Sequence, residues 1–546
     1  MKLAREDYEF NNTQICHIMP KHIELDRVLI NLYMLLKHDG KRPVARTGRR
    51  EVDVDFLVEQ LLLQHADELR GFADHQDVVR DWVYSDLVDM VYRGIPDKEV
   101  VAAPLPLHLN AYKLRNPKQA KDYRAAEHLF SMLRAGEPGL VCRLADFLGQ
   151  GMDASASYDT YDRRTPLDLD TLMIVRMVDA PNLKDSASGD KGYLEPPLCM
   201  GQARLLAADV RALLAYERII PRRVLIGYLR AAFGLHLGLY LLRLFRQVSG
   251  WVRDTEAHPA CMNCPVDANA REPFAQCPYA FQNPAAEIPL PELLVDMDDD
   301  YTSHLAGLAR ENCERVYAQM NDYIQAVFTL NQVKRFAMSD RGKKHLPQSP
   351  KSVGDLAALL KAPSKVMLDY FSDRLDDLIP SGTLAEEREA VRAIYEMEGL
   401  NSLQRFVELV ALERTRYYRS YLIRQLDSVF MKNQATCLLR QGKGRRNERR
   451  WHIGSQMLEM LVQVSVLQPE GSGFRSRPIL VDDLLLWLQQ RYGLTLMPHW
   501  PAATIQDYEA FNNNLRILKQ RLREIGFYTD LSDAYNAQII RPRYEI

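Results

Sequence analysis

The stretch DYEAFNNNLRILKQRLREIG, residues 507–526, gives the clearest indication of a fold in this 546-residue chain. Apolar side chains recur in it at helical spacing and form one stripe: Phe511, Leu515, Leu518, Leu522 and Ile525. Polar and basic side chains lie off that stripe: Asn512, Asn513, Arg516, Lys519, Gln520 and Arg523. The pattern predicts an amphipathic helix with a hydrogen-bonding, basic outer face.

The residues around this helix predict a winged helix-turn-helix. VDDLLLWLQQRYG (481–493) is a second amphipathic pattern closed by a glycine, and after 526 two β-like runs, FYTDLS and AQIIRPRYEI, flank the polar turn DAYN. In a winged helix the second helix presents donors to DNA base edges, where Asn and Gln can pair with adenine and Arg or Lys with guanine or phosphate. Two alternatives remain open: a module that docks another protein, and a small helical cap with a solvated basic face.

A basic run just upstream, RQGKGRRNERRWH (440–452), strengthens the nucleic-acid hypothesis. Its six cations could neutralise phosphates and release counterions: Arg440, Lys443, Arg445, Arg446, Arg449 and Arg450. Trp451 could offer a stacking face beside them. From residue 440 onward the chain has 15 basic and 11 acidic side chains, whereas the whole chain has a net charge of -2. Positive charge is therefore concentrated where the winged helix is predicted.

The cysteine-rich stretch HPACMNCPVDANAREPFAQCPYAF (258–281) predicts a metal site. Cys261 and Cys264 form a C-x2-C pair, Cys277 follows and His258 precedes, which together make a Cys3His ligand set for Zn²⁺. Four protein ligands leave no position for water, so we expect the zinc to be structural. Two alternatives remain: an iron–sulfur cluster completed by Cys199 or Cys313, and cysteines without metal.

Helical periodicity elsewhere predicts a mainly α, multi-domain protein with a small zinc-finger-like insertion and the C-terminal winged helix-turn-helix. We expect a helical domain over 1–198, a helix pair with the zinc element over 199–298, a helical domain with a long helix 301–334 over 299–436, and the basic loop with the winged helix over 437–546. The apolar run AAFGLHLGLYLL (231–242) is too short to span a bilayer and predicts a core helix. We expect a cytoplasmic protein without membrane contact.

Familiar catalytic motifs are missing from the sequence: no Walker A loop, no G-x-S-x-G and no HExxH. LLVDMDDDY (293–301) gathers Asp296, Asp298, Asp299 and Asp300, which could chelate Mg²⁺, but their place before the long helix favours a role in capping it. We therefore expect a protein that turns over no substrate by itself. The alternative is a metal-dependent nuclease with an unrecognised active site.

Three C-terminal segments resemble the ends of subunits encoded in bacterial multi-gene anti-phage defence operons, beside helicases, ATPases or methyltransferases. They are RRWHIGSQMLEMLVQVSVL (449–467), RSRPILVDDLLLWLQQRYG (475–493) and LREIGFYTDLSDAYNAQIIRPRY (522–544). The resemblance implies a non-enzymatic adaptor or scaffold subunit that helps a helicase, ATPase or nuclease to bind double-stranded DNA. A subunit that only docks other proteins is the alternative, and the resemblance assigns no site residues.

Overall fold

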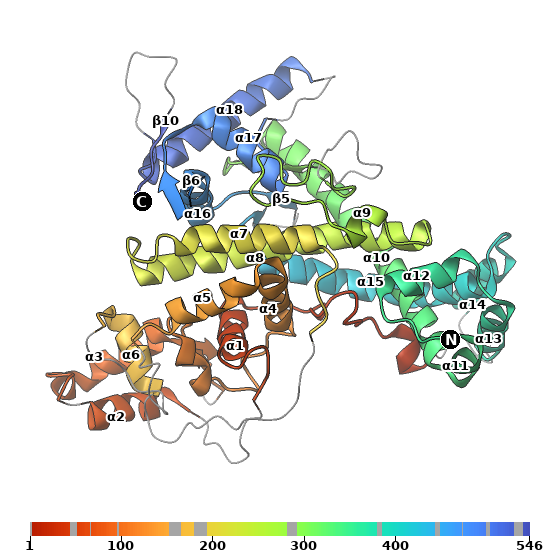
Figure 1. Cartoon of the computed structure of the whole chain (residues 1–546), viewed down its shortest axis with the longest axis horizontal. Helices are drawn as coiled ribbons and strands as arrows, with labels where there is room; N and C mark the ends of the chain where they lie inside the picture. The colour runs from red at the N-terminus through yellow and green to blue at the C-terminus, as the bar shows by residue number, and fades with distance from the viewer. Residues whose placement is uncertain are drawn as a thin grey trace.

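The computed structural model is mainly helical, with 59% of residues in helices, which confirms the predicted α class. It describes residues 3–43, 52–65, 67–95, 98–151, 165–178, 194–280, 292–378, 385–442, 448–471, 473–497, 503–528 and 539–546. Figure 1 shows two long helices, α7 and α8, crossing the middle of the molecule, with the N-terminal helices on one side of them and the C-terminal elements on the other.

The N-terminal part is built of short helices and one antiparallel strand pair. Its helices are α1 (Leu25–Lys37), α2 (Val54–Gln64), α3 (Gln76–Trp82), α4 (Ala125–Gly136), α5 (Pro138–Leu148) and α6 (Leu169–Val178). Its strands are β1 (Val88–Val91) and β2 (Val100–Pro104). Its short helical turns are η1 (Arg5–Tyr8), η2 (Ala73–His75), η3 (Val83–Leu87) and η4 (Leu109–Leu114). They pack against α7 (Met200–Leu214), mainly through α4.

The central helix α8 (Arg222–Arg253) forms the core of the molecule. It is long and apolar enough to span a membrane by length and composition, yet 83% of its most apolar 18-residue window is buried inside the protein. The end of α15 (Ser402–Val429) approaches it closely, because Gly238 faces the ring of Phe430 and a Cβ there would overlap that ring. Gly234 and Gly238, the two glycines within the apolar run, therefore allow α8 and the end of α15 to pack closely together.

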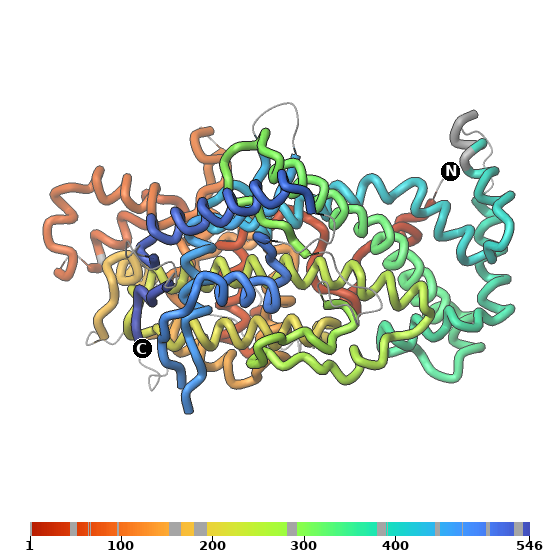
Figure 2. The backbone as a smooth tube through the Cα atoms, turned by 90° about the horizontal axis from the view of Figure 1, so that it is seen from above, coloured from red at the N-terminus to blue at the C-terminus, as the bar shows by residue number. Residues whose placement is uncertain are grey.

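A second helical body follows the central pair. The long helix predicted at 301–334 is α10 (His304–Met338), and the shorter helices after it are α11 (Asp340–His345), α12 (Val353–Lys361), α13 (Lys365–Asp376) and α14 (Ala385–Glu396). Figure 2 shows the N-terminus beside this body and far from the C-terminus. Asp7 fixes the N-terminal segment there by pairing with Arg335 and Arg374.

The C-terminal part mixes helices with two-stranded sheets. Its elements are β4 (Leu439–Gln441), β5 (Arg449–Trp451), α16 (Ser455–Ser465), β6 (Leu467–Glu470), β7 (Gly473–Ser476), β8 (Ile479–Leu480), α17 (Val481–Tyr492), β9 (Leu494–Thr495), α18 (Ile505–Glu524) and β10 (Ile539–Ile540). Antiparallel pairs join β4 to β5, β6 to β7 and β8 to β10, and β9 runs parallel to β3 (Leu293–Leu294). The predicted turn DAYN lies outside the described residues.

Most buried apolar side chains form one connected cluster that includes Leu3 and Ile540, and a small second cluster contains Leu294, Leu305, Ala309 and Phe511. The four predicted domains therefore pack on a shared core, and their boundaries stay predictions. The cysteine-rich insertion packs on the same core through Val266, Phe274 and Tyr279, and its one helix is the short α9 (Pro259–Met262).

Candidate functional site

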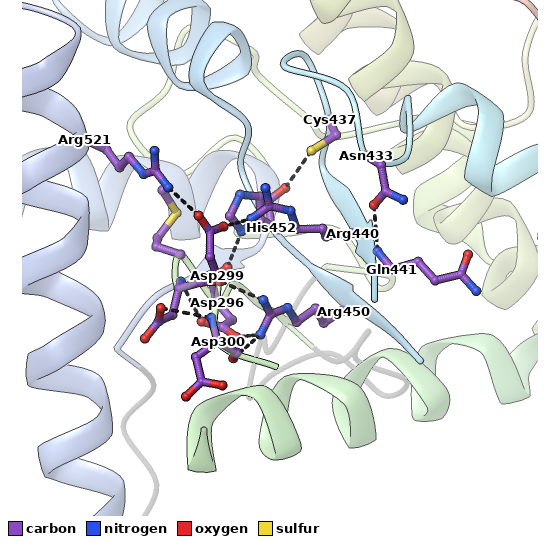
Figure 3. A network of polar contacts seen from close by, with 12 residues as sticks. Asp296, Asp299, Asp300, Asn433, Cys437, Arg440, Gln441, Arg450, His452 and Arg521 are labelled. Atoms are coloured by element: carbon purple, nitrogen blue, oxygen red, sulfur yellow. Dashed lines mark hydrogen bonds and ion pairs between the residues drawn. The ribbon is translucent and has the colours of Figure 1, made fainter. Parts of the chain in front are cut away.

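The acidic run before α10 and the basic run of the β4–β5 hairpin meet in the folded protein (Figure 3). The Arg450 guanidinium pairs with the carboxylate of Asp296, and neither side chain is exposed to solvent. Arg450 also donates to the carbonyl oxygens of Asp300 at 2.9 Å and Asp298 at 2.7 Å. Two runs of opposite charge, about 150 residues apart in sequence, thus neutralise each other at a buried contact.

A buried histidine completes this contact. The Nδ1 atom of His452 lies 2.8 Å from the carbonyl oxygen of Asp296. Burial lowers the pKa of His452 to about 3, so its ring is neutral at physiological pH. Burial also raises the pKa of Asp296 to about 6, although the charge of Arg450 acts in the opposite direction. The Arg450 side chain lies 4.1 Å from the ring centroid of Tyr301 and is enclosed on that side too.

The acidic run acts as a partner for arginines rather than as a helix cap. Asp299 accepts from Arg440 of β4 and, at 3.1 Å, from Arg521 of α18, so it links the hairpin to the last helix. The N-cap of α10 is Ser303, whose hydroxyl accepts from the backbone N–H of Ala306. The capping role predicted for the run is therefore wrong, and arginines pair with two of its carboxylates, those of Asp296 and Asp299.

The structure corrects the prediction for Arg450 and Trp451 of the basic run, whereas phosphate binding by its other cations stays a prediction. Arg450 and Trp451 are fully buried, so Arg450 cannot reach a phosphate and Trp451 cannot stack on a base. Arg449 is held by both oxygens of Asp427 at 2.7 and 2.8 Å. Trp451 faces α10, where its ring meets that of Tyr317. Three further cations of the run lie outside the described residues: Lys443, Arg445 and Arg446.

The polar residues predicted on the outer face of α18 lie where the pattern places them. Five of them are exposed and Lys519 is half-buried; the five are Asn512, Asn513, Arg516, Gln520 and Arg523. The opposite face is docked, because Phe511 packs with Leu294, Leu305 and Ala309 near the start of α10. The helix therefore presents one polar face to solvent from a fixed position.

Asn514 anchors α18, and the sequence analysis did not single it out. Its side-chain NH₂ donates to the carbonyl oxygens of Val295 at 2.9 Å and Leu496 at 3.2 Å, and its Oδ1 accepts from the backbone N–H of Met297 at 2.8 Å. The available signal was position: Asn514 follows Phe511 by three residues and so lies on the apolar face, where a polar side chain needs partners.

The outer face of α18 is not uniformly basic. Gln520 donates to Glu524 at 3.0 Å, and Asn513 lies 3.4 Å from a carboxylate oxygen of Asp298. Two apolar side chains at the first turns are also exposed, Ile505 by 80% and Tyr508 by 54%. The face therefore combines a polar stripe with an apolar corner, which suits either a nucleic acid or another protein.

The cysteines gather differently from the predicted set. Cys261, Cys264 and Cys277 line one small cavity together with Cys199 of the chain before α7. His258 is not among the residues that line it; its Nδ1 accepts from the backbone N–H of Ala260 at 3.2 Å and caps α9. Within the described part of the chain, no three His, Cys, Asp or Glu side chains form a group that could hold one ion, so zinc stays a prediction.

The family model described as Methylation-associated defense system protein MAD7 matches residues 5–544. No curated protein and no solved structure matches the chain.

Proposed function

We propose a function from the premise that the chain belongs to the MAD7 family of methylation-associated defense system proteins. Membership makes it a component of a multi-protein defence system, in agreement with the resemblance of its C-terminal segments. Within that system we assign it the role of a non-enzymatic adaptor that binds double-stranded DNA through α18. Cytoplasmic location, a structural zinc and partners such as a helicase, ATPase or nuclease belong to the same proposal.

The exposed polar face of α18 carries this proposal. Asn512, Arg516, Lys519 and Arg523 follow one another at steps of four, three and four residues and form a single stripe along the helix. A rigid helix with amide and guanidinium donors on one side matches the hydrogen-bonding edges of the DNA major groove. The anchoring of its other face by Asn514 means that little conformational entropy is lost when DNA binds.

Strand pairing around α18 supports a winged-helix arrangement. β8 precedes α17, β10 follows α18, and the two strands pair antiparallel with Ile539 opposite Leu480. Ile540 also forms a bridge with Tyr528, directly after α18. The order is β8, α17, the short β9, α18, a single-residue bridge at Tyr528 and then β10. Apart from β9, which pairs with β3, this order is compatible with a winged helix-turn-helix.

Charge removal on α18 tests the proposal. We expect wild-type protein to bind a short DNA duplex in a salt-dependent manner by fluorescence anisotropy. The triple variant Arg516→Ala/Lys519→Ala/Arg523→Ala should weaken binding at least roughly tenfold and reduce the slope of log K against log salt by about 2–3.

The matched control removes charge elsewhere. Arg475 and Arg477 are exposed on the β7 side and pair weakly with Glu470 at 3.6 and 3.4 Å. The variant Arg475→Ala/Arg477→Ala should bind as wild type does. Equal affinity and equal salt slope for the α18 variant and wild type, with the helical circular-dichroism signal intact, would refute DNA binding through this helix.

A docking role is the second candidate, favoured by the exposed apolar corner of α18. Ile505 and Tyr508 lie one helical turn apart and are 80% and 54% exposed. Exposed apolar side chains beside a polar rim are typical of protein interfaces. If the corner binds another subunit, Ile505→Asp should abolish co-purification with other proteins of the defence system and leave the anisotropy titration with DNA unchanged.

A further inference from the structure

Four cysteines converge where α7 begins, where α8 nears its end and where the insertion 259–280 folds back on both. Cys199 is the N-cap residue of α7, and it lines the same cavity of about 20 Å³ as Cys261, Cys264 and Cys277. A single water-sized sphere occupies about 10–15 Å³ by this measure, so the space is small. The four thiols therefore lie around one small volume, although as placed no three of them form a group that could hold an ion. A bound metal would have to draw them closer together.

One buried cation also lies beside these thiols. Arg243 of α8 lines the same cavity, is almost fully buried, and donates to the carbonyl oxygen of Tyr279 at 2.9 Å and to Gln202 at 3.0 Å. Its guanidinium would offset part of the net negative charge that four thiolates leave on a divalent ion.

We propose that Cys199, Cys261, Cys264 and Cys277 form a tetrathiolate site for a thiophilic metal centre, with Cys199 in the position that the sequence pattern assigned to His258. The C-x2-C pair supplies two thiolates from one tight turn, and both zinc and iron–sulfur clusters accept four cysteine ligands. Cys313, the other candidate from the sequence, is buried in α10 beside Arg449 and does not line the cavity.

The site would hold the insertion in the shape that α17 requires. The carbonyl oxygen of Ala268 accepts from Arg491 at 2.8 Å, and Glu272 accepts from Gln490 at 2.7 Å. Arg204 of α7 binds the insertion from the other side through the carbonyl oxygens of Cys264 and Val266, both at 2.9 Å. A metal centre would thus join the start of α7 to the segment on which the C-terminal part docks.

Metal analysis of the purified full-length chain tests the site. We expect about one zinc per chain, or iron with acid-labile sulfide, and the second result identifies a cluster. Cys199→Ser should reduce the metal content at least about tenfold, whereas His258→Ala and Cys313→Ser should retain it. No metal in the wild-type chain, retention by Cys199→Ser, or loss in His258→Ala would overturn the proposal.

A second measurement covers the case in which Cys199→Ser does not fold. The wild-type chain is refolded with Co²⁺, and the intensity of its thiolate-to-cobalt charge-transfer absorption is measured. This intensity is compared with that of cobalt-substituted zinc proteins whose number of cysteine ligands is known. Intensity matching four thiolates supports the tetrathiolate site. Intensity matching three thiolates and one imidazole would instead establish His258 as the fourth ligand.

Discussion

Replacing Arg450 by methionine should destabilise the fold by about 3–5 kcal/mol at neutral pH, because it leaves the buried carboxylate of Asp296 without its cation. Both side chains of this pair are fully buried. Methionine keeps much of the arginine's apolar volume, so the change removes charge and hydrogen bonds more than packing. The bonds from Arg450 to the carbonyl oxygens of Asp298 and Asp300 are lost as well.

The pH dependence distinguishes this electrostatic cost from a packing defect. The pKa of Asp296 is raised from 3.8 to about 6 in the folded protein, so the folded state binds its proton more tightly than the unfolded chain does. The contribution of Asp296 to the free energy of unfolding is therefore largest below about pH 4. It falls by about 3 kcal/mol in total as the pH rises through 6. Arg450 lowers the pKa of Asp296, so its removal extends the decline to higher pH. The cost of Arg450→Met should be larger at pH 8 than at pH 5.

Urea unfolding followed by tryptophan fluorescence measures the effect, with Trp451 next to the substituted residue as a local reporter. Arg449→Met is the matched control, since Arg449 is 23% exposed in its pair with Asp427 and should cost only about 1 kcal/mol. Midpoints are compared at both pH values, because a chain of this size need not unfold in two states. Equal losses for the two variants, or a cost for Arg450→Met that is the same at pH 5 and pH 8, would refute the reasoning.

Other substitutions test helix packing in the core and a second buried ion pair. Gly238→Ala should destabilise the protein by about 1–3 kcal/mol in thermal melts, because the new Cβ overlaps the ring of Phe430. The control is Gly227→Ala in the same helix. Its Cβ meets no atom within 4 Å, so it should stabilise the protein by about 0.5–1 kcal/mol. Asp209→Asn should cost about 3–5 kcal/mol at pH 7, because Arg491 loses a buried partner. The pKa of Asp209 is lowered to about 2, so this difference should be full above about pH 4 and shrink as the pH falls toward 2; a constant difference would contradict it.

Local periodicity was sufficient for the helices and their faces. Phe511, Leu518 and Leu522 of the predicted apolar stripe are buried in α18. The helix predicted at 301–334 extends from His304 to Met338. Such predictions succeed because neighbouring residues on a helix share a face whatever the rest of the chain does. Helix ends are set by capping groups such as Ser303, which explains shifts of a few residues.

Local periodicity does not indicate which residues far apart in the sequence contact each other in the fold. Nothing within 440–452 indicates that Arg450 faces Asp296, because the two residues meet only after α10 and the β4–β5 hairpin pack together. The same basic pattern would suit an exposed phosphate-binding loop, and charge alone does not show which side chains become buried. The sequence named Cys199 only as one of two residues that could complete an iron–sulfur cluster, because it lies 62 residues before Cys261 and no spacing rule connects the two.

The amino-acid sequence by itself determined the α class, the amphipathic helices near the C-terminus, the polar face of α18 and, through its C-terminal resemblance, the association with a defence system. Only the tertiary structure decided which charges remain available and which thiols share a cavity. The physical reason is that amphipathic periodicity is a property of neighbouring residues, whereas ion pairing and metal ligation depend on distances between segments that fold together from far apart.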